Sequence, residues 1–360
     1  MMRLARPQES APPRRRPRGP ASTGPTGLHA LPRPVAAVVG AGGVLGAAHV
    51  GVGHALEERG FVPDMIIGTS VGALNGAIAA AHPDRAAQWL DLIWTELRRR
   101  DVYRLGYLSS RVSLFTDRGL RRLIARAGLP MRIEDLAVPF TAVATDLLTG
   151  APALLDHGDL ESALLASAAI PGVLPPVDRG GRTFVDGGVI AYVPVLAALE
   201  AGAASVVVVP TGPESAPPPP TVPRLRAGAI AARAAVLMLR HQIERDLWEV
   251  SRHLPTVVLP TGTEDWPAPW DFGHSQRLID AASLTAGRFV DALRIDGPGL
   301  YRAEPGPNET PKGTADMAPK EPVDMASEAT SQEMSHVTSE VTSERSSQRS
   351  AHTIRSGVLL

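Results

Sequence analysis

The chain of 360 residues contains no cysteine and only two lysines among its 36 basic residues. Without cysteine it can form neither a disulfide scaffold nor a cysteine-ligated metal or iron–sulfur site, and a thiol cannot be its nucleophile. Arginine therefore carries almost all of the positive charge. Together with the many alanines and prolines, this is more typical of a GC-rich coding bias than of a function that requires guanidinium groups.

Long apolar runs are also missing, since none reaches the ~20 residues that a membrane-spanning helix requires. The best candidate, Ala227–Leu239, is too short and contains Arg233. The formal net charge is −1, whereas a dedicated nucleic-acid binder usually carries a clear basic excess. We therefore expect neither a membrane span nor a nucleic-acid partner.

The charge is distributed unevenly, and so is the apolar content. Residues 1–34 hold seven arginines, one glutamate and eight prolines, and residues 304–360 are rich in Ser, Thr, Glu and Pro. Such segments cannot bury enough apolar surface to offset the entropy of ordering. The sequence predicts a disordered basic arm over 1–34, one folded domain over 35–296 with a proline-rich loop at 211–223, and a disordered tail over 304–360.

Within the predicted domain, short apolar runs alternate with stretches of helical periodicity. This order predicts an α/β fold with a mainly parallel sheet and helices on both faces. The predicted strands are Val35–Val39, Met65–Ile67, Phe140–Ala144, Thr183–Val185, Ser205–Val209 and Thr256–Leu259. The predicted helices are His49–Arg59, Val71–His82, Ala86–Arg99, Asp117–Ala127, Asp159–Ala169, Val195–Ala201, Gly228–Arg252 and Ser275–Leu293.

Gly68-Thr69-Ser70-Val71-Gly72 lies between a predicted strand and a predicted helix. In that context a G-x-S-x-G pattern forms a sharp turn that exposes the serine hydroxyl at a helix N-terminus, where the helix dipole favours developing negative charge. The pattern predicts that Ser70 is a nucleophile. The alternative is that Ser70 only caps the helix.

A glycine-rich loop, Gly40–Gly46, follows the first predicted strand. Such a loop can present several backbone N–H groups to one point, which suits a phosphate or an oxyanion. Neither the acidic residue of a dinucleotide site nor the Lys-Ser/Thr pair of a P-loop is present. An oxyanion hole facing Ser70 fits better, and a purely structural turn is the alternative.

Asp186-Gly187-Gly188 follows the predicted strand Thr183–Val185. A carboxylate at a strand end can accept a proton from a serine, although an isolated aspartate there is more often a turn former. The carboxyl ends of parallel strands meet at one edge of a sheet. We therefore expect Asp186 to lie close to Ser70 and to the glycine loop.

Five motifs in this order resemble the patatin-like phospholipases in their bacterial form. They are the glycine-rich loop, G-T-S-V-G, Ala144–Gly150 (ATDLLTG), Ser167–Pro176 (SAAIPGVLPP) and Phe184–Gly188 (FVDGG). The resemblance covers about Val35 to Asp296. It implies a three-layer α/β/α fold and an acyl-ester hydrolase in which Ser70 is the nucleophile and Asp186 the general base. It also implies an oxyanion hole from the amides of Gly42, Gly43 and Val44, with Gly68, Gly72, Gly187 and Gly188 as motif glycines.

Two departures from the family pattern stand out. Ala41 replaces the first of three glycines and Leu45 replaces the usual basic residue of the first motif. An asparagine often found shortly after the aspartate is absent from residues 189–192. Either the oxyanion hole works through backbone amides alone, or activity is reduced.

The resulting expectation is a cytoplasmic or peripherally membrane-associated lipid hydrolase that needs no cofactor or metal and acts on phospholipids or other acyl esters. Two other functions stay open, an acyltransferase and a catalytically weak lipid- or partner-binding protein; no oligomeric state is predicted. The segment Arg98–Phe115 mixes arginines with large apolar residues and suits an interfacial lid, or an ordinary connection on the core. Of the histidines, we expect His49 and His82 to be structural, and His274 is the one to test for a Ser-Asp-His mechanism.

Overall fold

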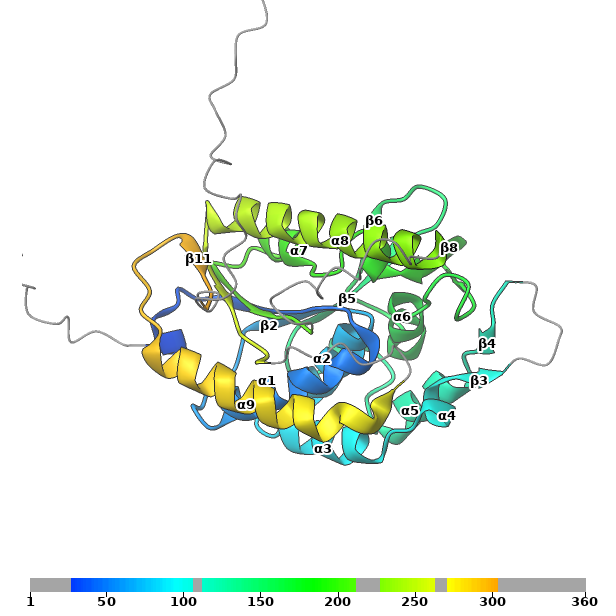
Figure 1. Ribbon diagram of the computed structural model, residues 1–360, viewed down its shortest axis with the longest axis horizontal. Coiled ribbons are helices and arrows are strands. Elements are labelled where there is room, and N and C mark those ends of the chain that lie inside the picture. Colours follow the sequence, from blue (N-terminus) through cyan, green and yellow to red (C-terminus); the bar gives the residue numbers. More distant parts are fainter. Residues whose placement is uncertain (1–26, 106–111, 212–226, 263–270, 304–360) are drawn as a thin grey trace, which may run out of the picture. The chain divides into compact units, whose positions relative to one another are not determined.

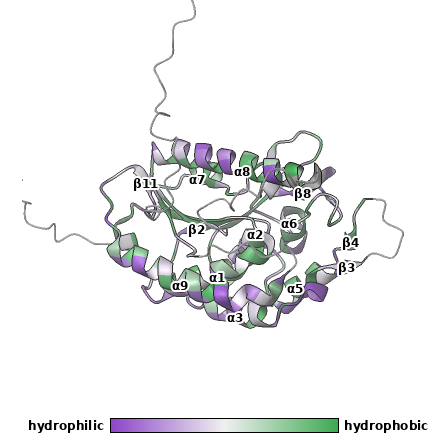
Figure 2. Ribbon diagram, in the orientation of Figure 1, coloured by the Kyte–Doolittle hydropathy of each residue, from purple (hydrophilic) through white to green (hydrophobic). Residues whose placement is uncertain are grey.

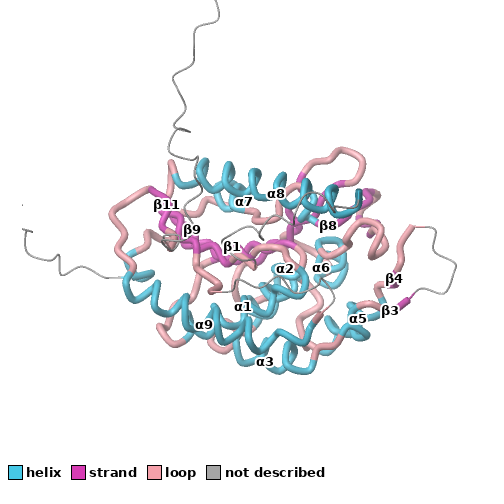
Figure 3. The backbone as a smooth tube through the Cα atoms, in the orientation of Figure 1, coloured by secondary structure: helices cyan, strands magenta, loops and turns pink. Residues whose placement is uncertain are grey.

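The computed structural model describes residues 27–105, 112–211, 227–262 and 271–303. In this part of the chain, a layer of strands lies between two layers of helices (Figures 1 and 3). Nine described strands form one sheet in the order β11-β10-β9-β1-β2-β5-β8-β7, with β6 also paired to β5. These strands are β1 (Val35–Val39), β2 (Met65–Thr69), β5 (Phe140–Asp146), β6 (Pro152–Leu155), β7 (Val177–Arg179), β8 (Arg182–Asp186), β9 (Ser205–Val209), β10 (Pro255–Val258) and β11 (Gly299–Tyr301).

The strands alternate their side chains between two apolar cores, as the period of two in a strand requires. Val35, Ala37 and Val39 of β1 belong to one core, and Ala36 and Val38 belong to the other. Helices α1, α2, α3 and α9 cover the first face, and α7 and α8 cover the second (Figure 1). Hydrophilic residues gather on the outer helices, whereas α2 is mostly hydrophobic (Figure 2). The three-layer α/β/α prediction is confirmed.

Every predicted helix is present, with ends that differ by a few residues. The helices are α1 (Ala47–Glu57), α2 (Val71–Ala81), α3 (Ala86–Glu96), α4 (Arg99–Val102), α5 (Arg118–Arg126), α6 (Leu160–Ser167), α7 (Val195–Glu200), α8 (Ala227–Ser251) and α9 (Ser275–Ala292). The short α4 was not predicted as a separate helix. No helix in the described ranges has both the length and the apolar character needed to span a membrane.

The sheet is parallel from β11 to β5, but the predicted direction of the strand that carries Asp186 was wrong. β8 runs antiparallel to β5, and β7 runs antiparallel to β8. Gly180 and Gly181 have φ values of 57° and 76°, so they form a tight reversal that joins β7 to β8. Strands β6, β7 and β11 were not predicted, since each has only three or four residues.

Part of the segment predicted as a disordered arm is packed on the domain. Gly27–Ala30 forms a 3-10 helix, Leu28 and Leu31 are buried, and Arg33 forms an ion pair of 2.7 Å with Asp64. The two leucines, three residues apart, supply apolar surface that the overall composition of the arm obscures. Residues 1–26, the tail from 304, and most of the proline-rich loop lie outside the described residues.

Candidate active site

Ser70 stands in a strained turn between β2 and α2. Its φ is 56° and its ψ is −122°, and among the described residues it is the only one other than glycine with a positive φ. A conformation of this kind costs about 1–3 kcal/mol and is typical of functional sites. The flanking glycines are needed because a Cβ on Gly68 would clash with the carbonyl of Gly72, and one on Gly72 would clash with that of Val39.

The turn is held from the opposite side by Ser167, at the end of α6. The amide of Ser70 donates to Ser167 Oγ at 2.9 Å, and this hydroxyl donates to the carbonyl of Val143 at 2.6 Å. Ser167 is fully buried. Sequence reasoning identified Ser167 only as part of a motif. The available signal was a serine directly after the apolar run 163–166 at the end of the helix.

The register of the sheet brings Asp186 level with Ser70. Thr69 pairs with Val143 on β5, and the next β5 residue, Ala144, pairs with Asp186 on β8. A Cβ on Gly187 would clash with the carbonyl of Val143, so glycine is required for this close approach. The predicted proximity of Asp186 to Ser70 is thus achieved by an antiparallel strand rather than a parallel one.

Asp186 is 5% exposed, and its carboxylate accepts hydrogen bonds from the Ser70 hydroxyl and, at 2.7 Å, from the Gly188 amide. Burial raises the pKa of Asp186 from 3.8 to about 6, although the hydrogen bonds from Ser70 and Gly188 oppose the rise. A carboxylate with this pKa is a stronger base than an ordinary aspartate and is still ionised near neutral pH.

The glycine loop lies beside Ser70. Gly42 and Gly43 have φ values of 150° and 57°, and a short 3-10 helix runs from Gly43 to Gly46. The first amides of a helix have no partner within it. In the described part of the chain, the amides of Gly42, Gly43 and Val44 donate to no other residue. These three N–H groups are thus free to bind an oxyanion.

Leu45 packs into a cluster of apolar side chains between helices, together with Val71 and Trp94. The position that is usually basic in the family is therefore part of the core here. No arginine or lysine side chain at residue 45 can contribute to the loop, so any charge stabilisation by this loop comes from backbone amides.

An apolar cavity of about 110 Å³, counted as the space open to the centre of a water-sized sphere, is lined in part by Gly43 and Ser70. Its walls come from helices α2 to α6 and include Leu74, Ile78, Trp94, Leu120, Ile124 and Leu164. The lining residues carry no formally charged side chain. The cavity therefore suits an acyl chain, because burying apolar surface stabilises a hydrocarbon by about 0.8 kcal/mol per CH₂ group.

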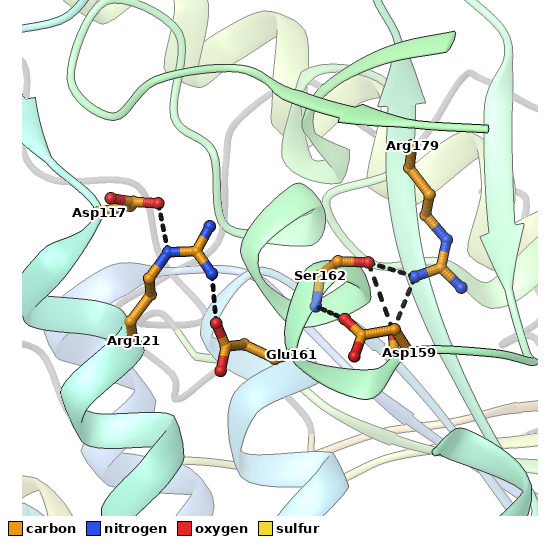
Figure 4. Close-up of polar contacts among 6 residues, drawn as sticks. All are labelled: Asp117, Arg121, Asp159, Glu161, Ser162 and Arg179. Atoms are coloured by element: carbon orange, nitrogen blue, oxygen red, sulfur yellow. Dashed lines mark hydrogen bonds and ion pairs between the residues drawn. The ribbon is translucent and has the colours of Figure 1, made fainter. Parts of the chain in front are cut away.

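Ion pairs and hydrogen bonds fix the helices that form one wall of this cavity (Figure 4). Arg121 of α5 binds Asp117 at 2.7 Å and also Glu161 of α6. Arg179 of β7 donates to the carbonyl of Asp159 at 2.7 Å and to the Ser162 hydroxyl. These groups are exposed or partly exposed to solvent, so each pair stabilises the wall by no more than about 1 kcal/mol.

Part of the predicted lid also borders the cavity. Leu97, Val102 and Tyr103 line it, whereas Arg98 and Arg100 are exposed. Residues 104–105 and 115–116 form a small antiparallel pair of strands, and residues 106–111 lie outside the described ranges. The described part of the segment thus has an apolar side toward the cavity and a basic side toward solvent.

The remaining motif aspartate, Asp146, closes a turn. It accepts hydrogen bonds from the amides of Leu148 and Thr149, each at 2.9 Å, and from Arg182 at 2.6 Å. The amide of Thr149 and the guanidinium of Arg182 lower the pKa of Asp146 to about 2. Asp146 is therefore a fixed anion that shapes the turn after β5.

In the described part of the chain, no histidine is among the residues that line the cavity with Ser70. His49 is buried between helices, where its Nδ1 lies 3.2 Å from Asn75 Nδ2, and burial lowers its pKa to about 3. Asn75 also donates to the carbonyl of Gly46 and accepts from Trp94. His274 is paired with Asp271 at 3.2 Å, at the start of α9. These contacts agree with a structural role for His49. They give no support to a Ser-Asp-His mechanism in which His274 takes part.

Comparisons with known proteins cover the same region. Residues 37–199 match the family described as "Patatin-like phospholipase". An "Uncharacterized NTE family protein" of Mycobacterium tuberculosis is 40% identical over 164 residues, which is 45% of this chain and 44% of that protein. The human "Patatin-like phospholipase domain-containing protein 6" is 34% identical over 186 residues, or 49% of this chain and 13% of that protein. The chain thus spans less than half the length of these relatives.

Among solved structures, that of VipD from Legionella pneumophila aligns with 74% of this chain and 69% of its own, at 13% identity and a TM-score of 0.40. The family match over residues 37–199 and the relatives named as patatin-like phospholipase domain proteins support a patatin-like phospholipase family for this region of the chain.

Proposed function

We propose that the chain is a serine acyl-ester hydrolase, of the phospholipase, lysophospholipase or esterase type, that acts in lipid metabolism. The observation that carries the proposal is the interaction of the strained Ser70 with the buried carboxylate of Asp186, where Ser70 also lines an uncharged apolar cavity. The names of its relatives, which include phospholipase domain proteins, agree with this activity.

In the proposed reaction, the substrate's acyl chain occupies the cavity and its ester carbonyl lies between Ser70 and the glycine loop. Asp186 takes the proton as Ser70 Oγ attacks the carbonyl carbon, and the amides of Gly42, Gly43 and Val44 bind the tetrahedral oxyanion. The alcohol leaves with the proton from Asp186. Water, activated by the same carboxylate, then hydrolyses the acyl-serine.

The test separates an enzyme from a binding protein. A fluorophosphonate probe is expected to label the purified chain at Ser70, and p-nitrophenyl esters are expected to be hydrolysed. Ser70→Ala should lose both signals, and Asp186→Asn should lose at least 10²-fold in kcat. Absence of labelling in folded wild-type protein would favour a lipid- or partner-binding function instead. Release of free fatty acid indicates a hydrolase, whereas transfer of the acyl group to an added alcohol indicates an acyltransferase.

The proposal includes peripheral contact with a membrane from the cytoplasmic side. Large apolar side chains are exposed just after the carboxyl end of β5 and just after Asp186: Leu147 at 52%, Leu148 at 84% and Val189 at 49%. Exposed arginines lie on the nearby lid segment. Apolar side chains beside basic ones suit an anionic lipid surface.

A further inference from the structure

Residue 41, which opens the oxyanion loop, is held through both of its backbone groups. The Ala41 amide donates to the carbonyl of Tyr192 at 2.8 Å, and the Thr211 hydroxyl donates to the carbonyl of Ala41 at 2.5 Å. Ala41 is 3% exposed and Thr211 is 1% exposed. Because these bonds are buried, breaking one leaves a polar group without a partner and destabilises this position of the loop.

The side chain of Tyr192 also interacts with that of Thr211. Ala41 is thus held between two residues, since its amide donates to the carbonyl of Tyr192 and its carbonyl accepts from the hydroxyl of Thr211. We call these contacts among Ala41, Tyr192 and Thr211 the loop clamp.

The loop clamp bears directly on the next residue of the oxyanion loop. A Cβ on Gly42 would overlap the Oγ1, Cβ and Cγ2 atoms of Thr211, so the Thr211 side chain lies against the Gly42 backbone. Gly42 has a φ of 150°, a value that favours glycine. The position of Thr211 therefore limits where the amides of Gly42, Gly43 and Val44 can point.

The loop clamp also reaches the turn that carries the base. An ideal Cβ on Gly188 would lie 3.4 Å from the Ala41 Cβ and 3.5 Å from the Tyr192 ring. The amide of Gly188 donates to Asp186. Beside Tyr192, the carbonyl of Ala191 accepts a hydrogen bond of 2.9 Å from the hydroxyl of Thr69, the neighbour of Ser70.

We propose that Tyr192 and Thr211 are positioning residues that lock the oxyanion loop in register with Ser70 and Asp186. Neither takes part in bond making, and this inference rests on the proposed hydrolase function. The hydroxyls act through Ala41 and Gly42 to aim the free amides at the place where negative charge develops. Misplacement of such donors weakens the transition state more than it weakens substrate binding.

The test compares Thr211→Val and Tyr192→Phe, which remove only hydroxyls, with Thr211→Ser, which keeps the hydroxyl. We expect kcat for a p-nitrophenyl ester to fall by about 10- to 100-fold in the first two variants, with KM within about twofold. Thr211→Ser should retain most of the activity. The rate of Ser70 labelling by the fluorophosphonate should fall in parallel, because that reaction also develops charge on an oxygen in the loop.

Matched controls remove similar hydroxyls far along the sheet. Thr256 is fully buried on β10 and donates to the carbonyl of Leu254, and Tyr301 on β11 donates to the carbonyl of Gly297. Thr256→Val and Tyr301→Phe should leave kcat within about twofold. If the control variants lose as much kcat as the clamp variants, the loss reflects general destabilisation and the inference is wrong. The inference is also wrong if Thr211→Val and Tyr192→Phe fold and keep the kcat of wild type.

A second measurement does not depend on catalysis. Hydrogen exchange of the segment 38–46, followed by mass spectrometry, should be faster in Thr211→Val than in wild type and unchanged in Thr256→Val, because the protected Ala41 amide becomes mobile. If wild-type protein neither hydrolyses esters nor labels at Ser70, the proposed function fails. Unchanged exchange in Thr211→Val overturns the loop clamp in either case.

Discussion

At the scale of single residues, Asp186 links chemistry to stability. Its pKa of about 6, against an ordinary value of 3.8, means that the folded protein binds a proton there more tightly than the unfolded chain does. The free energy of unfolding therefore falls as pH rises from about 4 to about 6, and above that range the whole destabilisation by the ionised Asp186 is present. The cost is at most about 3 kcal/mol, from a shift of about two units.

We therefore expect Asp186→Asn to be more stable than wild type at pH 8 and equally stable at pH 3.5. Urea unfolding at both pH values measures this difference. Asp84→Asn, at an exposed surface position, controls for the loss of one negative charge. A variant that is less stable than wild type at pH 8 would contradict a desolvated, ionised carboxylate.

The same pKa predicts the pH dependence of catalysis. The base must be ionised to accept the Ser70 proton, so kcat/KM should rise with pH and level off above an apparent pKa near 6. Initial rates with a neutral ester, measured from pH 4.5 to 8.5, give the profile. The fluorophosphonate labelling rate should follow the same curve; a flat profile over this range would rule out Asp186 as the base.

At the scale of elements, the wall of the cavity formed by α5 determines how much acyl chain fits. Ile124 is buried in this wall. Ile124→Trp should fill part of the cavity, so the ratio of kcat/KM for a dodecanoyl ester to that for a butanoyl ester should fall by about tenfold or more. Arg122→Trp, on the exposed side of the same helix, is the control. If Ile124→Trp lowers kcat/KM equally for both esters, the acyl chain does not bind in this cavity.

The sequence allows the parallel part of the fold to be predicted, because each buried strand is a short apolar run followed by a helix. It also allows Ser70 and Asp186 to be selected, because glycines mark the close approaches around them. The direction of β8 could not be predicted, since it depends on the reversal at Gly180 and Gly181 and on pairing with the distant β5. Contacts such as those of Ser167 and Thr211 join segments about 100 residues or more apart, so no local pattern signals them.

At the scale of the whole molecule, the exposed apolar residues near the active site predict how the protein meets a lipid surface. Leu148→Asp places a charge on the most exposed of them and should reduce binding to anionic phospholipid vesicles by about tenfold. Sedimentation with vesicles at two salt concentrations measures this binding. Leu284→Asp, on an exposed part of α9, should have little effect. If both variants bind as well as wild type, membrane contact does not involve this surface.

The left-handed backbone at Ser70 has a consequence for how this chain persists over evolutionary time. A glycine at residue 70 would relieve the positive φ, and an asparagine at residue 186 would remove a desolvated charge, so drift without selection for chemistry would favour both replacements. Ser70 carries backbone strain and Asp186 carries a desolvated charge, and each destabilises the folded state. The backbone strain and the buried charge thus lie at the two residues to which the proposed function assigns the reaction.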